Sequence, residues 1–463
     1  MLAALVVVLV VGAQPEVVEL DNGMRWLLVP RADQGWVAGA VAVAAGGAHE
    51  HEGQTGAAHL LEHLAFAGTP MLGSPLGWRV EAPAMERVEA LLRARAALGQ
   101  APAHDPRAML LETELVQAEQ RWRETSEVSA LLALMSEHDV GVNANTSKDR
   151  TVYFGEFARE KLELWLSVEA QRFAAPVFRE FRSEREVVIQ ELRDRQSDLQ
   201  RASEALWAMA FEGTGYAWST IGREQDLLAM HPGVLDAFYV THYVPSNAVG
   251  VLVGEFEPAE ARRLLARTFA LLPRRPAPAP LSDAARPQAR ERVVKSASPL
   301  LLLGFPRPAD FAAEAASWEV AELALLNAGP TGPLARLAQE GLVAQSVLSR
   351  GPGVAQAHLQ TFSLVLPRGG EAPRVRARLF ELLSAWEPDE AEIASARVAL
   401  ELSRRRTIRS RRTLAESLAE ELLYTRGWQS LLSSKYATVT RADVLRVLRS
   451  WSPERAFVVE GRP

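Results

Sequence analysis

The sequence between Gly56 and Gly68 is mostly apolar, contains no proline, and is rich in alanine and leucine. This composition predicts an α-helix, and its large apolar share predicts that the helix is buried. Three polar residues interrupt the apolar pattern, namely His59, Glu62 and His63. Because residues four apart share one face of a helix, the two histidines can present ring nitrogens to a single ion.

The remaining apolar positions follow two periods along the chain. Short runs rich in β-branched and aromatic residues predict strands, and longer amphipathic stretches between them predict helices. Strands are predicted at 16–30 (as a hairpin), 36–45, 151–154, 246–253, 300–305, 361–366 and 456–460. Because both halves of the chain repeat the same kind of order, we expect an α+β fold of two similar domains, each a mixed, mainly antiparallel sheet with helices on one face.

One region departs from this pattern, from about residue 70 to residue 138. It is dominated by two charged, Ala/Leu/Glu-rich stretches of helical period, 84–98 and 107–129, which a proline-containing segment separates. Such an arrangement predicts an αα-hairpin. We interpret it as an insertion into the first domain, with a structural or a gating role.

A proline-rich segment at 273–280 marks the clearest boundary in the chain. Segments of this kind form extended, semi-rigid linkers, and 463 residues exceed what one hydrophobic core usually supports. We therefore predict a first domain at 14–275, a linker at 276–290 and a second domain at 291–463.

Residues 1–13 contain a short apolar run that ends at small residues. The run resembles a secretory signal peptide and is far too short to span a bilayer, although no Lys or Arg precedes it. An ordinary buried strand is the alternative interpretation. Export would place the protein in the periplasm or outside the cell; without export it is cytoplasmic.

The composition narrows the possible function classes. A hydrophobic share of 48% with 23% charged residues is typical of a globular protein. The net charge of −6 gives no general case for binding nucleic acid or an acidic membrane, and we expect neither a nucleic-acid partner nor an integral membrane span. The chain has no cysteine, so any transition metal must be held by histidines and carboxylates.

Alternative interpretations exist for the polar residues of these helices. Glu184 and Glu191 are seven residues apart and share a helical face, but by itself this pattern also fits a solvated, charged helix. The two histidines of the first helix also fit a solvated surface; their apolar neighbours favour a metal, since an unsatisfied buried polar group costs about 1–3 kcal/mol. His49 and His51, in the polar loop before that helix, are expected to be solvated and not metal ligands.

The chain carries several ordered motifs, at 55–69, 143–147, 151–153, 184–191 and 243–248. Together they resemble the pitrilysin/insulinase family of zinc metallopeptidases, the inverzincins, which are recognised by the His-x-x-Glu-His order. The resemblance covers nearly the whole chain from about residue 17, as a bacterial-type member with a single, two-domain half.

The resemblance implies roles for five residues. His59, His63 and Glu191 would bind one Zn²⁺ per chain, which leaves a fourth position for water. Glu62 would be the general base that accepts a proton from this water, and Glu184 would orient the ligands from behind. The implied activity is hydrolysis of peptides or unfolded protein segments by a zinc-dependent endopeptidase.

The resemblance extends to substrate binding. Asn143, Ala144 and Asn145 match the family's edge strand, which binds an extended peptide by β-augmentation. The interval from His63 to Glu191 is longer than usual in the family, and the predicted hairpin accounts for the excess.

One departure concerns the second half of the chain. Active family members complete the site there with an Arg and a Tyr a few residues apart, but the matching stretch at 332–346 has no Tyr, and Arg336 is not at the expected interval. We therefore expect a homodimer, or a heterodimer with a zinc-less relative that supplies the pair. The alternative function is a non-catalytic or partner-dependent structural subunit of a heterodimeric peptidase complex.

Overall fold

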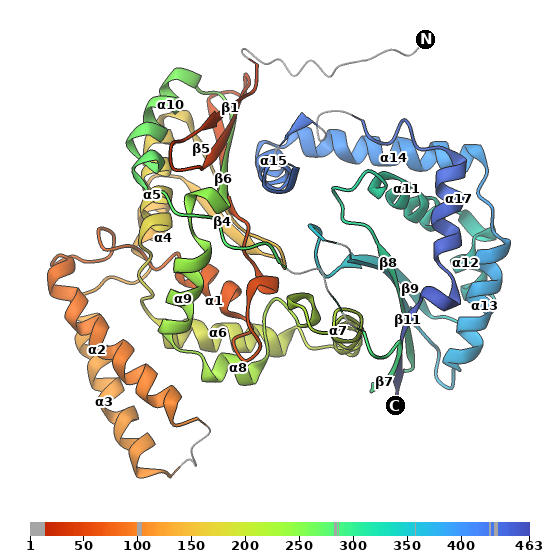
Figure 1. The fold of residues 1–463 in the computed structure, drawn as a ribbon, viewed down its shortest axis with the longest axis horizontal. Coiled ribbons are helices and arrows are strands. Elements are labelled where there is room, and N and C mark those ends of the chain that lie inside the picture. The colour runs from red at the N-terminus through yellow and green to blue at the C-terminus, as the bar shows by residue number, and fades with distance from the viewer. Residues whose placement is uncertain are drawn as a thin grey trace. The chain divides into compact units, whose positions relative to one another are not determined.

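The computed structural model describes residues 14–99, 104–281, 285, 287–356, 358–425, 427–429 and 434–463. The described chain forms two compact units (Figure 1). Unit 1 comprises the residues up to Arg193, Ser219–Pro280 and Arg411–Leu423, and unit 2 comprises Asp194–Trp218, Leu281–Ser410 and Tyr424–Pro463. Each unit thus contains a short segment from the other half of the sequence, and the predicted linear domain boundaries stay a prediction.

Unit 1 is built on a six-stranded sheet with the order β1-β2-β6-β3-β5-β4. The strands are β1 (Glu16–Glu19), β2 (Arg25–Pro30), β3 (Trp36–Val43), β4 (Gly141–Thr146), β5 (Thr151–Ala158) and β6 (Ala248–Gly254). All neighbouring strands are antiparallel except β2 and β6. Small residues in β3 allow close packing, because a side chain at Gly39 would collide with the Trp165 ring. β4 is left as an edge strand.

The main helical layer of unit 1 covers one face of this sheet. Its helices are α1 (Ala57–Leu64), α4 (Ala130–Glu137), α5 (Leu162–Ala174), α6 (Phe181–Asp194), α8 (Glu224–Ala229), α9 (Pro232–His242) and α10 (Pro258–Arg267). Trp26, Val41 and Leu252 of the sheet share a buried core with Leu61 of α1 and Trp165 of α5. The apolar residues of the predicted metal helix are therefore its anchors in the core.

The second face of this sheet is covered by α15 (Arg411–Thr425), which comes from the second half of the sequence. The Arg412 guanidinium lies 5.7 Å from the centre of the Phe154 ring, and Arg411 forms an ion pair with Glu156 at 2.7 Å. Phe154 and the core residue Tyr153 are adjacent in β5, so their side chains point to opposite faces of the sheet.

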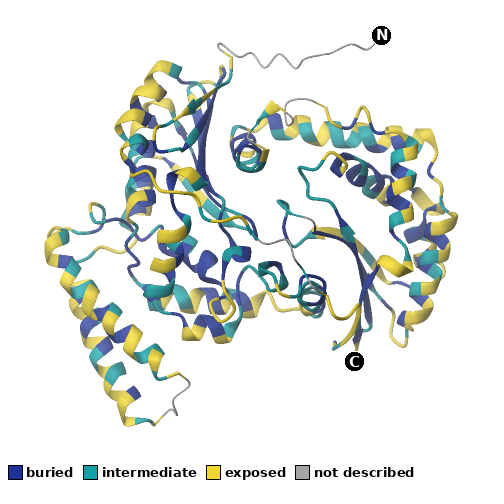
Figure 2. Ribbon diagram, viewed as in Figure 1, coloured by how far each residue is buried: buried dark blue, intermediate teal, exposed yellow. Residues whose placement is uncertain are grey.

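The predicted insertion contains α2 (Trp78–Ala97) and α3 (Pro106–Arg123), which pack side by side and project from the rest of unit 1 (Figure 1). Val88 and Leu92 of α2 and Leu115 and Trp122 of α3 are buried, whereas many outward positions are exposed (Figure 2). Residues 100–103 of the connection lie outside the described residues. α4 then leads the chain back into β4.

Unit 2 is built on a five-stranded sheet with the order β7-β11-β8-β10-β9, in which only β7 and β11 are parallel. The strands are β7 (Glu291–Lys295), β8 (Leu300–Arg307), β9 (Gln345–Gly351), β10 (His358–Val365) and β11 (Phe457–Arg462). The main helices are α11 (Ala315–Leu326), α12 (Pro333–Gln339), α13 (Ala372–Ala385), α14 (Glu390–Arg409) and α17 (Arg441–Ser450). Phe305 and Phe362 of the sheet pack with Val320 and Leu379 of the helices in the core of unit 2.

The other face of this second sheet is contacted by α7 (Asp198–Ala210), from the first half of the sequence. A side chain added at Gly304 of β8 would meet Leu206 of α7 at 3.1 Å. The neighbouring residues Leu303 and Phe305 point into the main core, so α7 lies opposite that core.

The predicted α+β class with two mixed, mainly antiparallel sheets is confirmed. The main helical layer lies on one face of each sheet, as predicted. Among the described residues, a further helix from the other half of the sequence packs on the second face of each sheet, α15 in unit 1 and α7 in unit 2. In the part of the chain that the structure describes, we find no helix with the length and apolar character needed to cross a membrane. The predicted signal peptide at 1–13 lies outside the described residues.

Candidate metal centre

Helix α1 presents its two histidines on one face. Gly56 precedes the helix with a φ of +92°, a conformation that favours glycine. The Glu50 carboxylate accepts hydrogen bonds from the backbone N–H groups of Gly56 and Ala58 at 3.0 and 2.9 Å, which places a negative charge at the positive end of the helix. The His59 and His63 ring centroids are 4.9 Å apart, so both rings serve one location.

Glu191 reaches the same location from α6. Its Oε2 lies 3.7 Å from Nε2 of His59 and 3.8 Å from Nε2 of His63. These distances are too long for hydrogen bonds but close to the separation of about 3.3–3.5 Å expected for ligand atoms on one tetrahedral zinc. The three ligand atoms lie within 4.8 Å of one another. The donor set of two imidazoles and one carboxylate fits Zn²⁺ with one coordination position left open.

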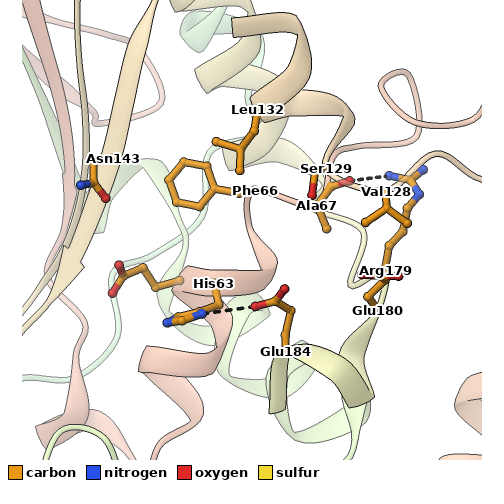
Figure 3. Close-up of a pocket in the computed structure, with 11 residues that line it drawn as sticks. His63, Phe66, Ala67, Val128, Ser129, Leu132, Asn143, Arg179, Glu180 and Glu184 are labelled. Carbon is orange, nitrogen blue, oxygen red and sulfur yellow. Dashed lines mark hydrogen bonds and ion pairs between the residues drawn. The ribbon is translucent and has the colours of Figure 1, made fainter. Parts of the chain in front are cut away.

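Glu184 contacts the other nitrogen of His63. The distance from His63 Nδ1 to Glu184 Oε2 is 3.3 Å (Figure 3). If Nδ1 carries the proton and donates it to this carboxylate, Nε2 keeps a lone pair on the side of Glu191. The same hydrogen bond is the main reason why the pKa of His63 is raised. Glu184 therefore fixes the orientation of one candidate ligand.

Glu62 is placed beside the candidate ligands and is largely buried. Burial raises the pKa of its carboxyl, whereas a hydrogen bond from Thr146 and the nearby charges of His63 and Arg172 act in the opposite direction. Its Oε2 is buried and accepts no hydrogen bond from any residue that the structure describes. A carboxylate with a raised pKa and a free acceptor atom is suited to take a proton from water.

The predicted substrate strand is β4, at the edge of the sheet. The backbone N–H of Ala144 donates to the side-chain oxygen of Asn143 at 2.8 Å. The side chain of Asn145 is engaged instead by Arg150, whose Nη1 donates to Asn145 Oδ1 at 2.7 Å. Of the two asparagines, Asn143 lines the cavity beside the candidate metal ligands, whereas Asn145 is held by hydrogen bonds within unit 1.

A cavity of about 260 Å³ opens next to His63 and Glu62 (Figure 3). Figure 3 shows Phe66 and Leu132 close together on the side of the cavity above His63, with Glu184 beside His63. The wall combines these apolar side chains with the carboxylates and with Asn143 of β4. It offers an apolar surface directly beside the candidate metal ligands.

Sequence analysis did not identify Arg179, which connects the segments on which the ligands stand. Its guanidinium donates to the carbonyl oxygens of Ala67, Thr69 and Leu72, at 3.3, 3.1 and 3.0 Å, in the loop that follows α1. It also forms an ion pair with Glu81 of α2. No local pattern distinguishes this arginine or this glutamate from the many others in the chain, so only the folded structure reveals the pair.

Of the two loop histidines predicted to be solvated, His51 is exposed as predicted, but the prediction was wrong for the half-buried His49. Its Nδ1 accepts a hydrogen bond from the Gly46 N–H at 3.1 Å, and its ring packs against His242 with 5.4 Å between centroids. Burial lowers the pKa of both histidines to about 4. The part of the polar loop around His49 is therefore folded against α9, whereas residues 51–54 are exposed.

Comparison with protein families gives two matches. Residues 29–74 and 121–224 match the family described as insulinase, peptidase family M16, and residues 231–387 match the peptidase M16 inactive domain. The first match includes all candidate ligands, Glu62 and the β4 strand. The residues left between its two parts, 75–120, correspond closely to the hairpin α2–α3.

Individual relatives agree with these matches. Coenzyme PQQ synthesis protein F of Pseudomonas aeruginosa is 27% identical over 390 residues, which cover 82% of this chain and 43% of that protein. The chain thus spans less than half the length of this curated relative. A protease from Helicobacter pylori has a TM-score of 0.76 at 19% identity, covering 97% of this chain and 100% of the protease. The periplasmic protease PqqL from Escherichia coli has a TM-score of 0.67 at 16% identity, and the match covers 98% of this chain and 48% of PqqL.

Proposed function

The chain belongs to the insulinase family of M16 peptidases, and on this premise we propose that it is a zinc-dependent endopeptidase acting on peptides or unfolded protein segments. The observation that carries the proposal is the convergence of His59, His63 and Glu191 on one location, with the half-buried Glu62 beside them. Bound zinc would supply Lewis-acid polarisation and lower the pKa of water to about 7.

Residues of this chain would carry out the proton transfers and orient the metal ligands. Glu62 accepts a proton from the attacking water while the water oxygen bonds to the peptide carbonyl carbon. Glu62 then passes this proton to the amide nitrogen as the C–N bond breaks. Glu184 holds His63 in the orientation that presents Nε2. Burial of Glu62 keeps its carboxyl basic enough for this proton transfer.

We propose that β4 binds the substrate backbone. It is the edge strand nearest the cavity, and the Ala144 N–H donates to the side chain of its neighbour Asn143. An extended peptide that pairs with this edge would be recognised mainly through its backbone. This mode of binding requires an unfolded segment and accepts many sequences.

A partner-dependent or non-catalytic subunit is the second candidate function. It is favoured by the absence of a Tyr at 332–346 and by the match of 231–387 to the inactive domain. Arg336 lies in α12 and is exposed. On this alternative, another copy of the chain or a zinc-less relative would have to supply the Arg and Tyr that complete the site.

We also propose a periplasmic location. It is supported by the apolar run at 1–13 and by the periplasmic location of the E. coli relative PqqL. N-terminal sequencing of the protein from its native cells would test this, and an intact Met1 would contradict export by a cleaved signal.

The proposed activity is tested with an internally quenched peptide library and the purified chain, with zinc content measured in parallel. Wild type should cleave, and Glu62→Gln should bind the same amount of zinc but lose activity by about 10²–10⁴-fold. Zinc-loaded wild type that cleaves nothing would contradict a self-sufficient enzyme and favour the second function. The mass of the particle in solution would then show whether the chain has a partner.

A further inference from the structure

A second cavity, of about 480 Å³, lies between α3 and the start of α6. It shares Val128, Arg179 and Glu180 with the cavity beside the candidate metal centre, so the two cavities are adjacent. Its far wall is formed by the hairpin, including Val116 and Trp122 of α3. A hollow walled by the insertion therefore lies directly beside the cavity at the metal ligands.

The row of adjacent cavities extends further along α3. A third cavity on this helix shares Val116 with the second and reaches Met109. The large apolar side chains along the three cavities include Leu132, Val128, Val116 and Met109, which are 39%, 42%, 55% and 55% exposed. We call these four residues the apolar track. It begins at the candidate metal centre and ends near the start of α3.

The charged residues beside the track largely neutralise one another. Arg182 of α6 forms ion pairs with Glu112 and Glu119 of α3, at 2.6 and 3.4 Å. Since both carboxylates share this cation, the groove presents no concentrated charge of one sign. Its chemistry suits the apolar side chains of a polypeptide better than a small charged ligand.

The hairpin is also held in a fixed position at its base. Glu81 of α2 binds Arg179 and accepts a hydrogen bond from Trp122 Nε1 at 2.8 Å, while Arg179 binds the loop after α1. These polar groups are buried and mutually satisfied, so the hairpin and the metal centre share one anchor. A groove wall fixed in this way can bind a flexible chain without first having to be ordered itself.

We propose that the insertion extends the substrate groove, and that apolar side chains of an unfolded polypeptide bind along the apolar track while the scissile bond lies at the metal centre. This inference rests on the proposed function and adds a substrate class to it, namely chains long enough to reach α3. Val116 and Met109 are seven residues apart on a helix, about 10 Å, which equals about three residues of extended peptide. Short peptides would miss this surface.

The test measures binding separately from cleavage. Labelled peptides of about 8 and about 16 residues, with the same core and a Leu/Val-containing extension, are titrated by fluorescence anisotropy against the Glu62→Gln protein loaded with zinc. The long peptide should bind about tenfold more tightly than the short one. Adding Val116→Asp should remove most of this gain and leave the affinity for the short peptide unchanged.

Val240→Asp is the matched control, because Val240 is also a helical valine with 55% exposure and lines none of the three cavities. Met109→Asp, at the far end of the track, provides a second variant if Val116→Asp does not fold. The proposal is overturned if the peptide affinity of the Glu62→Gln protein does not depend on peptide length, or if both aspartate variants made in this protein keep the full gain. The proposal is also overturned if Val116→Asp dissociates an oligomer of the protein and does not weaken binding of the long peptide, because the apolar track would then be a subunit interface. Failure of zinc-loaded wild type to cleave the short peptide would count against the proposed function alone.

Discussion

The Arg179 guanidinium and the Glu81 carboxylate form a buried two-point ion pair, with Nε–Oε1 and Nη2–Oε2 distances of 2.7 and 2.8 Å. Their side chains are 1% and 0% exposed. Glu81 belongs to the insertion, whereas Arg179 stands two residues before α6, the helix that carries Glu191. Through Arg179 and its bonds to the loop after α1, the insertion is joined to both elements that supply the candidate ligands.

Breaking this pair should be costly. Glu81→Ala leaves the Arg179 charge buried without its partner, and we expect a loss of about 3–5 kcal/mol in the free energy of unfolding, measured in urea. The double variant Glu81→Leu with Arg179→Met should lose less than the sum of the single changes, since it removes both charges. Glu160→Ala, which breaks an exposed pair with Arg159, is the control and should change stability little. Additive effects at Glu81 and Arg179 would contradict this coupling.

The two glutamates of α6 should affect metal binding to different degrees. Glu191→Gln removes a proposed ligand and should abolish stoichiometric zinc, whereas Glu184→Gln should weaken zinc binding by about 10–100-fold because it only loosens His63. Competition with a chromogenic chelator measures the zinc affinity of both variants. Glu186→Gln is the matched control on the same helix, because this exposed residue pairs with Arg185 and should leave zinc affinity unchanged. Equal affinities in all three variants would exclude the proposed ligand set.

The edge of β4 offers a test of backbone recognition. Proline at position 144 would remove the N–H that donates to Asn143. In the register with β5 this residue falls at a non-hydrogen-bonded pair, so its N–H points away from β5. Edge strands tolerate proline where the lost donor faces outward. We expect Ala144→Pro to raise KM by about five- to tenfold with little change in kcat, the effect of one lost hydrogen bond. Unchanged KM in a folded variant would mean that substrates do not pair with this position.

Stability should fall in mild acid because of two half-buried histidines, His49 and His242. Burial lowers the pKa of His49 and His242 to about 4 from the usual 6.5. Below pH 6.5 the unfolded chain therefore binds more protons than the folded chain, and stability decreases until about pH 4, by about 1–3 kcal/mol from this pair.

The variant His242→Phe separates this effect from the titration of carboxylates. It removes one of the two titrating groups and keeps an aromatic ring packed against Phe238. Urea unfolding at pH 7 and pH 4.5 should show a smaller acid-induced loss in the variant than in wild type. Identical losses would show that this pair does not contribute to the acid sensitivity.

The first part of the site could be predicted from local sequence because its geometry is local. His59 and His63 share a helical face wherever the helix stands, and the apolar residues around them place that helix in a core. The hairpin arms and most of the strands are likewise visible as periodic patterns. The predicted solvation of His49 failed because a loop's polar composition does not reveal whether it folds onto another element.

The remaining features depend on contacts between distant segments. A charged helix with several carboxylates does not indicate by itself that Glu191 faces the histidines and that Glu184 lies behind one of them. From the sequence, only the resemblance to a known family identified these two glutamates. The ion pair of Arg179 with Glu81, the apolar track and the packing of α7 and α15 against sheets of the other half leave no local pattern at all. Periodicity reports which face of an element is buried, whereas its partner is selected by shape, charge and hydrogen bonding across the folded chain. The sequence by itself thus determined the fold class and the metal helix, and only the tertiary structure decided what surrounds that helix.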